Sequence, residues 1–389
     1  MSIFNKVLER KNTNSLKWDL MEKIYGIEDA SELLPMWVAD MDFAPPKEVV
    51  QAIEKRLSHP IFGYSYVCDD CKGAIVDWFK RRHSLTINPE TILFQQGVVP
   101  AIASIIETFT EPGDRVAIST PVYPPFFTVP RNQKRELISC DLNENNGIYS
   151  YDFEALEEVF KQGVKIYILC NPHNPGGIVW DRTTLERLVE LCIQYDVLII
   201  SDEIHADIVL EGAKYTPLST VARADEANIL TLIAPTKTFN LAGIQAAVIV
   251  APKDDLRLQL QQNELAHGQI ELNVFASPAV HAAYTYGDAW LDELLDYLST
   301  NMDYVIRELT SLQGITIIKP QGTYLLWIDY RETGLEEKEI MDKLLRIGKL
   351  ALEPGSKYGE AGQGFLRMNV ACPFDTVKEG VERFKKALQ

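Results

Sequence analysis

A single lysine, Lys237, lies in the stretch A-P-T-K-T-F-N-L-A-G at residues 234–243. Strongly apolar runs flank it, N-I-L-T-L-I-A before and A-A-V-I-V after, so the amine is expected beside buried strands. An amine among apolar walls loses part of its preference for the charged form, and its pKa falls. A neutral lysine can form a Schiff base with an aldehyde. A solvated loop lysine is the commoner alternative for any single lysine.

Three further stretches place polar groups where apolar runs end. V-L-I-I-S-D ends in Asp202, and a buried carboxylate there needs a cation, such as a protonated ring nitrogen. C-N-P-H-N-P-G-G places Asn174 in a proline-broken turn that would hold its amide stiffly. Q-Q-G-V-V-P-A-I begins a helix after glycine, where the N–H groups of Val98 and Val99 could cradle a phosphate. The ordinary alternatives are an exposed strand end, a capped turn and a plain strand-to-helix turn.

These four features combine at one place if their strands are parallel, because ligands bind at the carboxyl ends of such strands. A phosphate cradle, a rigid amide, a carboxylate and a lysine match one cofactor, pyridoxal 5′-phosphate. That molecule carries a phosphate ester, a protonatable ring nitrogen and an aldehyde.

The elements that must position these residues alternate along the chain between about residues 90 and 250. Apolar, β-branched runs at 91–97, 115–119, 134–140, 165–170 and 197–202 are separated by helix-like segments such as 98–110, 152–160 and 183–195. Near-continuous apolar strands indicate a sheet covered on both faces. We therefore predict an α/β fold with a mostly parallel sheet flanked by helices.

The pattern changes after about residue 287. A long helix is expected at 288–311, followed by strands at 315–320, 323–330 and 364–373, with helices near 336–347 and 375–388. This pattern predicts a smaller α+β domain. The expected divisions are an N-terminal segment (1–47) that joins the small domain, a large cofactor-binding domain (48–287) and the small C-terminal domain (288–389).

Composition narrows the class of protein. The 389-residue chain has a formal net charge of −17, which argues against a general nucleic-acid binder. It has no apolar run of membrane-spanning length and no signal-peptide pattern at its start. Its six cysteines include one C-x-x-C at 68–71 but no second Cys or His pair to complete a metal site, and scattered thiols suit the reducing cytoplasm.

Three motifs in this order, N-P-H-N-P-G-G, S-D-E-I-H-A-D and P-T-K-T-F-N-L-A-G, carry a resemblance over essentially the whole chain. The sequence resembles the fold-type I pyridoxal-phosphate enzymes of the class I/II aminotransferase superfamily. L-P-M-W-V-A-D-M-D-F, F-G-Y-S-Y and F-L-R-M-N-V-A-C-P make it similar to the cystathionine β-lyase, or C–S lyase, branch.

The resemblance implies roles for the cofactor-binding residues. Lys237 would bind the cofactor aldehyde covalently, and Asp202 would pair with the ring nitrogen and keep it protonated. Asn174 would hydrogen-bond the ring oxygen, and Tyr123 would stack on the ring face unless it is ordinary aromatic packing. Val98 and Val99 would supply phosphate-binding N–H groups.

The resemblance also implies how substrate and a second subunit are bound. Arg367 would hold the substrate α-carboxylate, for which a bidentate guanidinium is suited, unless it is a surface-strand arginine. Tyr64 would reach the phosphate of the neighbouring subunit, which implies a homodimer with shared active sites. Val38 and the loop around Tyr358 would shape the substrate pocket, where Tyr64 and Asn174 would also contribute.

Three positions depart from the aminotransferase pattern. His205 stands where many aminotransferases have a tyrosine on the ring oxygen, as in the lyase branch. Ala234 replaces a common serine and leaves Thr236 as the remaining hydroxyl, and Gln245 replaces a phosphate-binding arginine. A doubly charged phosphate would have fewer partners here, which favours the lyase over a standard aminotransferase.

The implied activity is α,β-elimination of cystathionine or another cysteine S-conjugate to a thiol, pyruvate and ammonia. Transamination remains an alternative because Lys237 serves both reactions. A regulatory or partner-binding protein on this fold is a lesser alternative, since the N-terminal segment leaves no room for a DNA-binding domain.

Overall fold

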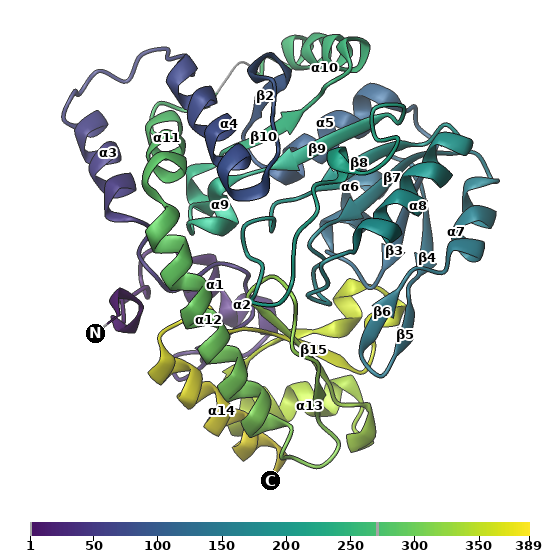
Figure 1. Cartoon of the computed structure of the whole chain (residues 1–389). Coiled ribbons are helices and arrows are strands. Elements are labelled where there is room, and N and C mark those ends of the chain that lie inside the picture. Colours follow the sequence, from purple (N-terminus) through teal and green to yellow (C-terminus); the bar gives the residue numbers. More distant parts are fainter. Residues whose placement is uncertain (1, 270–271) are drawn as a thin grey trace.

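A seven-stranded sheet forms the centre of the larger part of the molecule (Figure 1). The computed structural model describes residues 2–269 and 272–389. The strand order is β2-β10-β9-β8-β7-β3-β4. The strands are β2 (Ile92–Gln95), β3 (Arg115–Thr120), β4 (Glu136–Asp141), β7 (Val164–Cys170), β8 (Leu198–Asp202), β9 (Ile229–Ile233) and β10 (Ala247–Val250).

Only β10 runs against its neighbours in this sheet. It pairs antiparallel with both β9 and β2, whereas the pairs among β9, β8, β7, β3 and β4 are parallel. Because two reversals cancel, β2 points in the same direction as β9. The prediction of a mostly parallel sheet is confirmed, and six strands end at the same edge.

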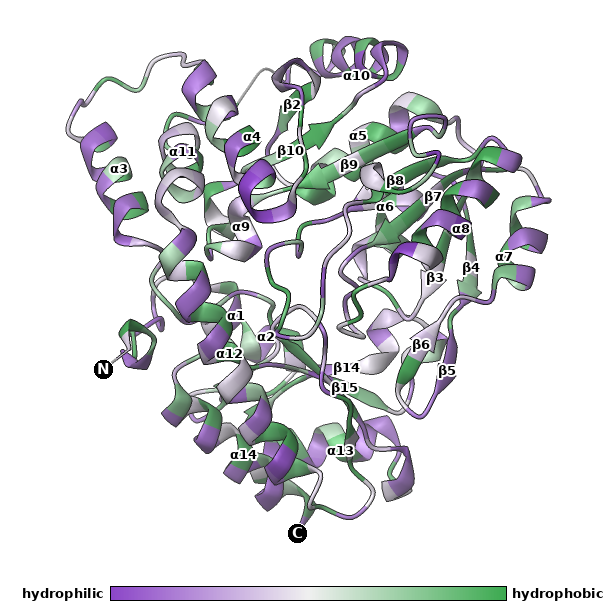
Figure 2. Ribbon diagram, viewed as in Figure 1, coloured by the Kyte–Doolittle hydropathy of each residue, from purple (hydrophilic) through white to green (hydrophobic). Residues whose placement is uncertain are grey.

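Helices cover both faces of this sheet, as the unbroken apolar strands predict. On β7, Tyr167 and Leu169 pack with α7 (Phe153–Phe160) and α8 (Arg182–Gln194). Ile166 and Ile168 point to the other face, which is covered by α5 (Val98–Phe109), α6 (Pro125–Asn132) and α10 (Asp254–Ala266). The strands are the most hydrophobic part of the fold in Figure 2, and the outer helix faces are hydrophilic. Asp152 caps α7, since its side chain accepts a hydrogen bond from the N–H of Ala155.

A four-stranded antiparallel sheet lies below the large sheet in Figure 1, in the order β11-β12-β15-β14. Its strands are β11 (Thr316–Ile317), β12 (Leu325–Asp329), β14 (Glu353–Pro354) and β15 (Phe365–Asn369). The helices of this region are α12 (Asp288–Leu309), α13 (Glu337–Lys343), continued by a π-turn at Leu344–Gly348, and α14 (Phe374–Leu388). The strands are shorter than predicted, and the division into domains at 47/48 and 287/288 stays a prediction.

The N-terminal region spans both parts of the molecule. Its elements are α1 (Leu16–Asp19), α2 (Met21–Tyr25), β1 (Leu34–Pro35), α3 (Lys47–Leu57) and α4 (Asp69–His83). β1 pairs in parallel with β13 (Leu350–Ala351), whereas α3 and α4 pack on α11 (Ala276–Tyr286). Apart from short 3₁₀ helices, the remaining elements are the hairpin β5 (Asn143–Asn145)–β6 (Ile148–Ser150) and the one-turn helix α9 (Pro235–Thr238). No helix in residues 2–269 or 272–389 is long and apolar enough to cross a membrane.

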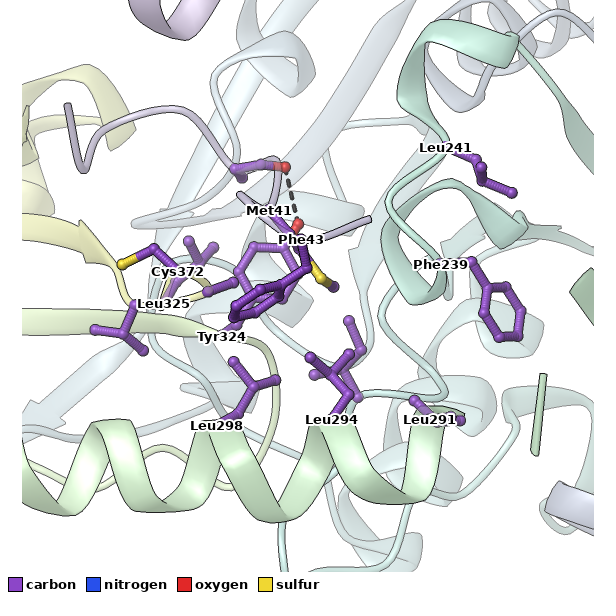
Figure 3. Close-up of a cluster of buried hydrophobic side chains, with 14 of the residues drawn as sticks. Met41, Phe43, Phe239, Leu241, Leu291, Leu294, Leu298, Tyr324, Leu325 and Cys372 are labelled. Carbon is purple, nitrogen blue, oxygen red and sulfur yellow. Dashed lines mark hydrogen bonds between the residues drawn. The ribbon is translucent and has the colours of Figure 1, made fainter. Parts of the chain in front are cut away.

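Residues 36–43 form what we call the closing segment, and its apolar side chains anchor it in the core. Figure 3 shows Met41 and Phe43 among Leu294 and Leu298 of α12 and the side chain of Tyr324. All five side chains are buried. The closing segment is therefore held against α12 and Tyr324 by ordinary hydrophobic packing.

Charged side chains hold the same segment from the N-terminal side. The ammonium of Lys17, which is 1% exposed, lies 2.7 Å from an oxygen of Asp42 and 3.6 Å from one of Asp40. The guanidinium of Arg10 contacts both carboxylates at 2.6 Å. Burial alone would raise the pKa of Asp42, but Lys17 and Arg10 lower it below its ordinary value. The two cationic side chains thereby compensate the negative charges of the two carboxylates in a poorly hydrated region.

Replacing Asp42 by Ala tests this anchor. The buried Lys17 ammonium would lose its nearest counter-charge, and we expect the free energy of unfolding to fall by roughly 3 kcal/mol. Urea unfolding measures the change, with Asp303→Ala as control because its ion pair with Lys319 is exposed. The control should lose less than about 1 kcal/mol. Equal losses for the two variants would show that the buried pair has no special role.

Candidate active site

The residues singled out from the sequence meet at the carboxyl edge of the large sheet. Asp202 is the last residue of β8, and Asn174 follows β7. Val98 begins α5 directly after β2, and Lys237 lies in α9 directly after β9. Tyr123 follows β3 in the same way. Because these strands point in one direction, their ends converge on one site.

Lys237 is half-buried, so part of its side chain faces an accessible space while protein surrounds the ammonium. Burial and repulsion by Arg367 lower its pKa to about 8, against the opposing attraction of Asp40 and Asp202. Its Nζ donates a hydrogen bond of 2.5 Å to the main-chain oxygen of Ala39 in the closing segment. A pKa near 8 leaves a useful fraction of neutral amine at neutral pH.

Asp202 is buried, with 3% of its surface exposed. The N–H of Ile204 is the one hydrogen-bond donor to its carboxylate in the described part of the chain, at 3.2 Å. Burial raises the pKa of Asp202 to about 7, although Ile204 and Lys237 partly oppose the shift. A buried carboxylate with so few partners suits a cationic ligand group, which would return it to its charged form.

Arg367 on β15 is buried and lies in contact with two of the predicted site residues. It donates from Nη1 to the side-chain oxygen of Asn174 at 3.1 Å, and from Nη2 to the main-chain oxygen of Trp37 at 2.8 Å. Its guanidinium lies 3.7 Å from Glu353 and over the ring of Tyr358. The buried Nε has no hydrogen-bond partner among the described residues. An unpaired N–H on a buried cation is suited to a ligand carboxylate.

His205 and Tyr123 lie close to the charged groups of the site. His205 is buried, and its Nδ1 has no hydrogen-bond partner in the described structure. Burial, with repulsion from Lys237 and Arg367, lowers its pKa to about 3, so the ring is neutral at physiological pH. Burial, and then the charge of Asp202, raise the pKa of the half-buried Tyr123. Both side chains can therefore donate a hydrogen bond at neutral pH.

The first turn of α5 has the features of the predicted phosphate cradle. N–H groups of a first helical turn have no intrahelical acceptor, which applies to Val98 and Val99. Gly97 precedes them with a φ of 155°, a backbone conformation that residues with a side chain disfavour. No side chain caps this end of the helix. Thr236 is half-buried in α9, while Gln245 is exposed. The role of these groups toward a phosphate stays a prediction.

Tyr64 is the one predicted site residue that the single chain leaves in solvent. It is fully exposed in the segment between α3 and α4 that projects from the molecule in Figure 1. Its role toward a cofactor phosphate stays a prediction. Val38 is half-buried, and its main-chain oxygen accepts a 2.6 Å hydrogen bond from Asn369.

Sequence reasoning missed the residues that hold the closing segment over Lys237. Asn369 also donates to the oxygen of Asp40, and Asn240 bonds the backbone of Met41 and Phe43. Tyr324 donates to the Ala39 oxygen at 2.8 Å. Each is polar within an apolar run, a signal that could have indicated a buried partner.

Comparison with known proteins identifies the family of the chain. Residues 32–384 match the family model described as aminotransferase class I and II. The chain belongs to this family. Among its relatives in the aminotransferase class I and II family is cystathionine beta-lyase PatB of Bacillus subtilis (strain 168). The two are 42% identical over 388 residues, which cover 99% of each chain.

Solved structures of similar proteins confirm the predicted fold. A pyridoxal-phosphate-bound putative aminotransferase from Clostridium difficile 630 has a TM-score of 0.95 and 40% identity, covering 99% of both chains. Cystalysin from Treponema denticola, whose structure contains a pyridoxal 5′-phosphate cofactor, has a TM-score of 0.95 and 33% identity. That match covers 99% of this chain and 98% of cystalysin.

The raised pKa of Asp202 predicts an unusual pH dependence of stability for protein free of bound small molecules. Between about pH 4 and pH 7 the unfolded chain releases this proton while the folded chain retains it. Stability therefore falls as pH rises through that window, by up to a few kcal/mol. Asp202→Asn has no proton to release, so it should gain stability over the wild type as pH rises from 4 to 7.

Urea unfolding at several pH values measures this difference. Asp225→Asn is the control, because Asp225 is exposed and its replacement should give a flat difference across the same range. A flat difference for Asp202→Asn as well would mean that this carboxylate ionises freely in the folded chain.

Proposed function

We propose that the protein is a pyridoxal-phosphate-dependent carbon–sulfur lyase that cleaves cystathionine or other cysteine S-conjugates by α,β-elimination. One observation carries the proposal. Lys237, the buried Asp202 and the incompletely paired Arg367 meet at one edge of the sheet, in a chain that aligns end to end with a relative named cystathionine beta-lyase. The products would be a thiol, pyruvate and ammonia.

The residues present fit the cofactor. Pyridoxal 5′-phosphate, when bound, supplies an aldehyde for covalent attachment and an electron-accepting ring. Lys237 would hold the aldehyde, and Asp202, which lacks a strong cation partner, would hold the ring nitrogen. Asn174 and His205, whose Nδ1 is unpartnered, would serve the ring oxygen. The aromatic ring of Tyr123 would cover the cofactor ring.

The phosphate would be bound at the start of α5. The free N–H groups of Val98 and Val99 and the partial positive charge of the helix end favour an anion. Thr236 would add its hydroxyl, and Tyr64 of a second chain would complete the set. These phosphate contacts would compensate for the missing positive charge at position 245, where the exposed Gln245 stands.

The chain's own residues then account for the reaction. Arg367 would bind the substrate α-carboxylate through its unpartnered Nε and orient the amino acid. Lys237, free again once the substrate amine has taken its place, and neutral in part because its pKa is about 8, would remove the Cα proton as general base. The charge of Asp202 would favour the electron-rich state that follows. A thiol pKa of about 8.5 makes the sulfur an adequate leaving group without a strong acid.

Transamination is the alternative within the same family. It needs the same lysine, carboxylate and arginine, and the similar protein from Clostridium difficile 630 is named a putative aminotransferase. The lyase is favoured because His205, Ala234 and Gln245 depart from the aminotransferase pattern, and because the full-length relative at 42% identity is named a lyase. A purely regulatory role is disfavoured by the lowered pKa of Lys237, which serves chemistry.

Incubation of the purified protein with L-cystathionine and no keto acid distinguishes the reactions. We expect pyruvate and a free thiol to form in equal amounts, detected by a coupled dehydrogenase assay and a thiol reagent. Lys237→Ala should reduce this rate by at least about 10²–10⁴-fold, because it removes the general base. Turnover that begins only when a keto acid is added would instead identify an aminotransferase.

We also infer that the active protein is a homodimer with shared sites. The segment between α3 and α4 exposes Ile61, Phe62, Tyr64 and Tyr66, each more than half exposed. Such a projecting apolar segment favours association with another chain. A second copy would bring Tyr64 to the phosphate end of its neighbour's site and make the interface isologous. The six cysteines are all free, which supports a cytoplasmic location.

Mixed dimers test the sharing of sites. Lys237→Ala and Tyr64→Ala should each lower activity, the latter at limiting cofactor. Chains carrying different tags are co-expressed, and the mixed dimer then has one site with both native residues. Random pairing should restore about one quarter of the wild-type activity. Activity equal to the average of the two separate variants would show that each site uses its own Tyr64.

A further inference from the structure

The carboxylate of Asp207 is buried beside the α9 turn that carries Lys237 and has no part in the chemistry proposed above. It is 6% exposed and lies five residues beyond Asp202, in the turns that follow β8. Three side chains contact it: Trp78 Nε1 at 2.8 Å, His83 Nε2 at 2.6 Å and Thr238 Oγ1 at 2.7 Å. Both carboxylate oxygens are therefore engaged, and the side chain is held in one orientation.

These contacts keep Asp207 ionised despite its burial. Burial alone would raise its pKa, but the interactions with His83, Thr238 and Trp78 lower it below the ordinary value. An ionised acceptor makes shorter and stronger hydrogen bonds than a neutral one. The bond to Thr238 is accordingly a firm attachment point for the chain around it.

Thr238 connects this carboxylate to the reactive amine. It is fully buried and is the peptide neighbour of Lys237 in α9. That helix has only four residues, and its N-cap residue makes no side-chain hydrogen bond. So short a helix is not stable by itself and takes its position from tertiary contacts.

The other two contacts fix Asp207 to a different element. Trp78 and His83 both lie on α4, and Trp78 also packs edge-on against Phe239, the residue after Thr238. Asp207 thus joins three pieces of the chain: the turns after β8, the α9 turn and α4. The helix α4 follows the exposed segment that carries Tyr64.

We propose that Asp207 is a positioning residue that fixes the α9 turn through Thr238 and thereby aims the amine of Lys237. It acts by placement and not by charge, since the charges that shift the Lys237 pKa are those of Arg367, Asp40 and Asp202. The inference rests on the proposed function only in taking Lys237 as the reactive amine. Reacting groups must be placed to within about 1 Å, and misplacement on that scale can cost about 10²-fold in rate.

Two variants of the holoenzyme separate positioning from mere stability. Thr238→Val removes the hydroxyl donor but keeps the side-chain shape, and it touches the neighbour of Lys237. Trp78→Phe removes a different donor to the same carboxylate, on α4. We expect Thr238→Val to lower kcat by about 10- to 100-fold with KM changed less than about two-fold. Trp78→Phe should keep kcat within about two-fold, because His83 still contacts the same carboxylate oxygen and the Thr238 bond is intact, although its unfolding midpoint in urea falls further.

Cofactor affinity and the pH dependence of kcat are measured beside these rates. The affinity for added pyridoxal 5′-phosphate, followed by its visible absorption, should fall several-fold in Thr238→Val and not in Trp78→Phe. The pH midpoint of kcat should be unchanged in Thr238→Val, because the charges around Lys237 are unchanged. Thr238→Ser keeps the donor and should restore wild-type kcat and wild-type cofactor affinity.

These experiments test the positioning role of Asp207 whatever reaction the enzyme catalyses, since cofactor affinity is measured without substrate. Wild-type kcat and affinity in a folded Thr238→Val protein would overturn the proposal. So would equal losses in Thr238→Val and Trp78→Phe, or a failure of Thr238→Ser to restore function. If Thr238→Val does not fold, Asp207→Glu takes its place, because it keeps the acceptor but moves it by one methylene; the same expectations and the same contrary results apply.

Discussion

The exclusion of water around one amine is the constraint on which the site depends. A solvated lysine keeps its proton until far above neutral pH, whereas the pKa of Lys237 falls to about 8 through burial and the nearby Arg367. The two acids in its surroundings, Asp40 and Asp202, act in the opposite direction. The site therefore balances one buried cation against two carboxylates, and removal of any of these charges changes how easily the amine loses its proton.

The closing segment makes that exclusion possible. Its main-chain oxygens at Trp37 and Ala39 contact the guanidinium and the amine, the two cationic groups of the site. Hydrophobic packing of Met41 and Phe43 holds the segment from one side, as Figure 3 shows. The N-terminal ion pairs hold it from another. Residues distant in sequence thus cooperate to place two carbonyl groups.

The sequence predicted those parts of the structure that local patterns control. The strand ends at Asp202 and just before Lys237 were predictable because β-branched runs indicate buried parallel strands, whose carboxyl ends meet. The reversed direction of β10 was not predictable, since nothing in its A-A-V-I-V run indicates whether the strand is parallel or antiparallel. Nor were the roles of Asn240 and Asn369, which depend on carbonyl groups some 200 and 330 positions away along the chain. Likewise, Tyr64 could be placed on the surface only once the packing of α3 and α4 was known.

Lys237 donates its hydrogen bond to a main-chain oxygen, that of Ala39. The use of a main-chain acceptor has an evolutionary consequence. Codon changes at position 39 alter a methyl group but leave the acceptor in place. Mutation can withdraw it at positions that hold the backbone there, and these include Asn240, Tyr324 and Asn369. Selection on this contact should consequently be visible at several sites scattered through the gene, while the residue that makes it remains free to drift among small side chains.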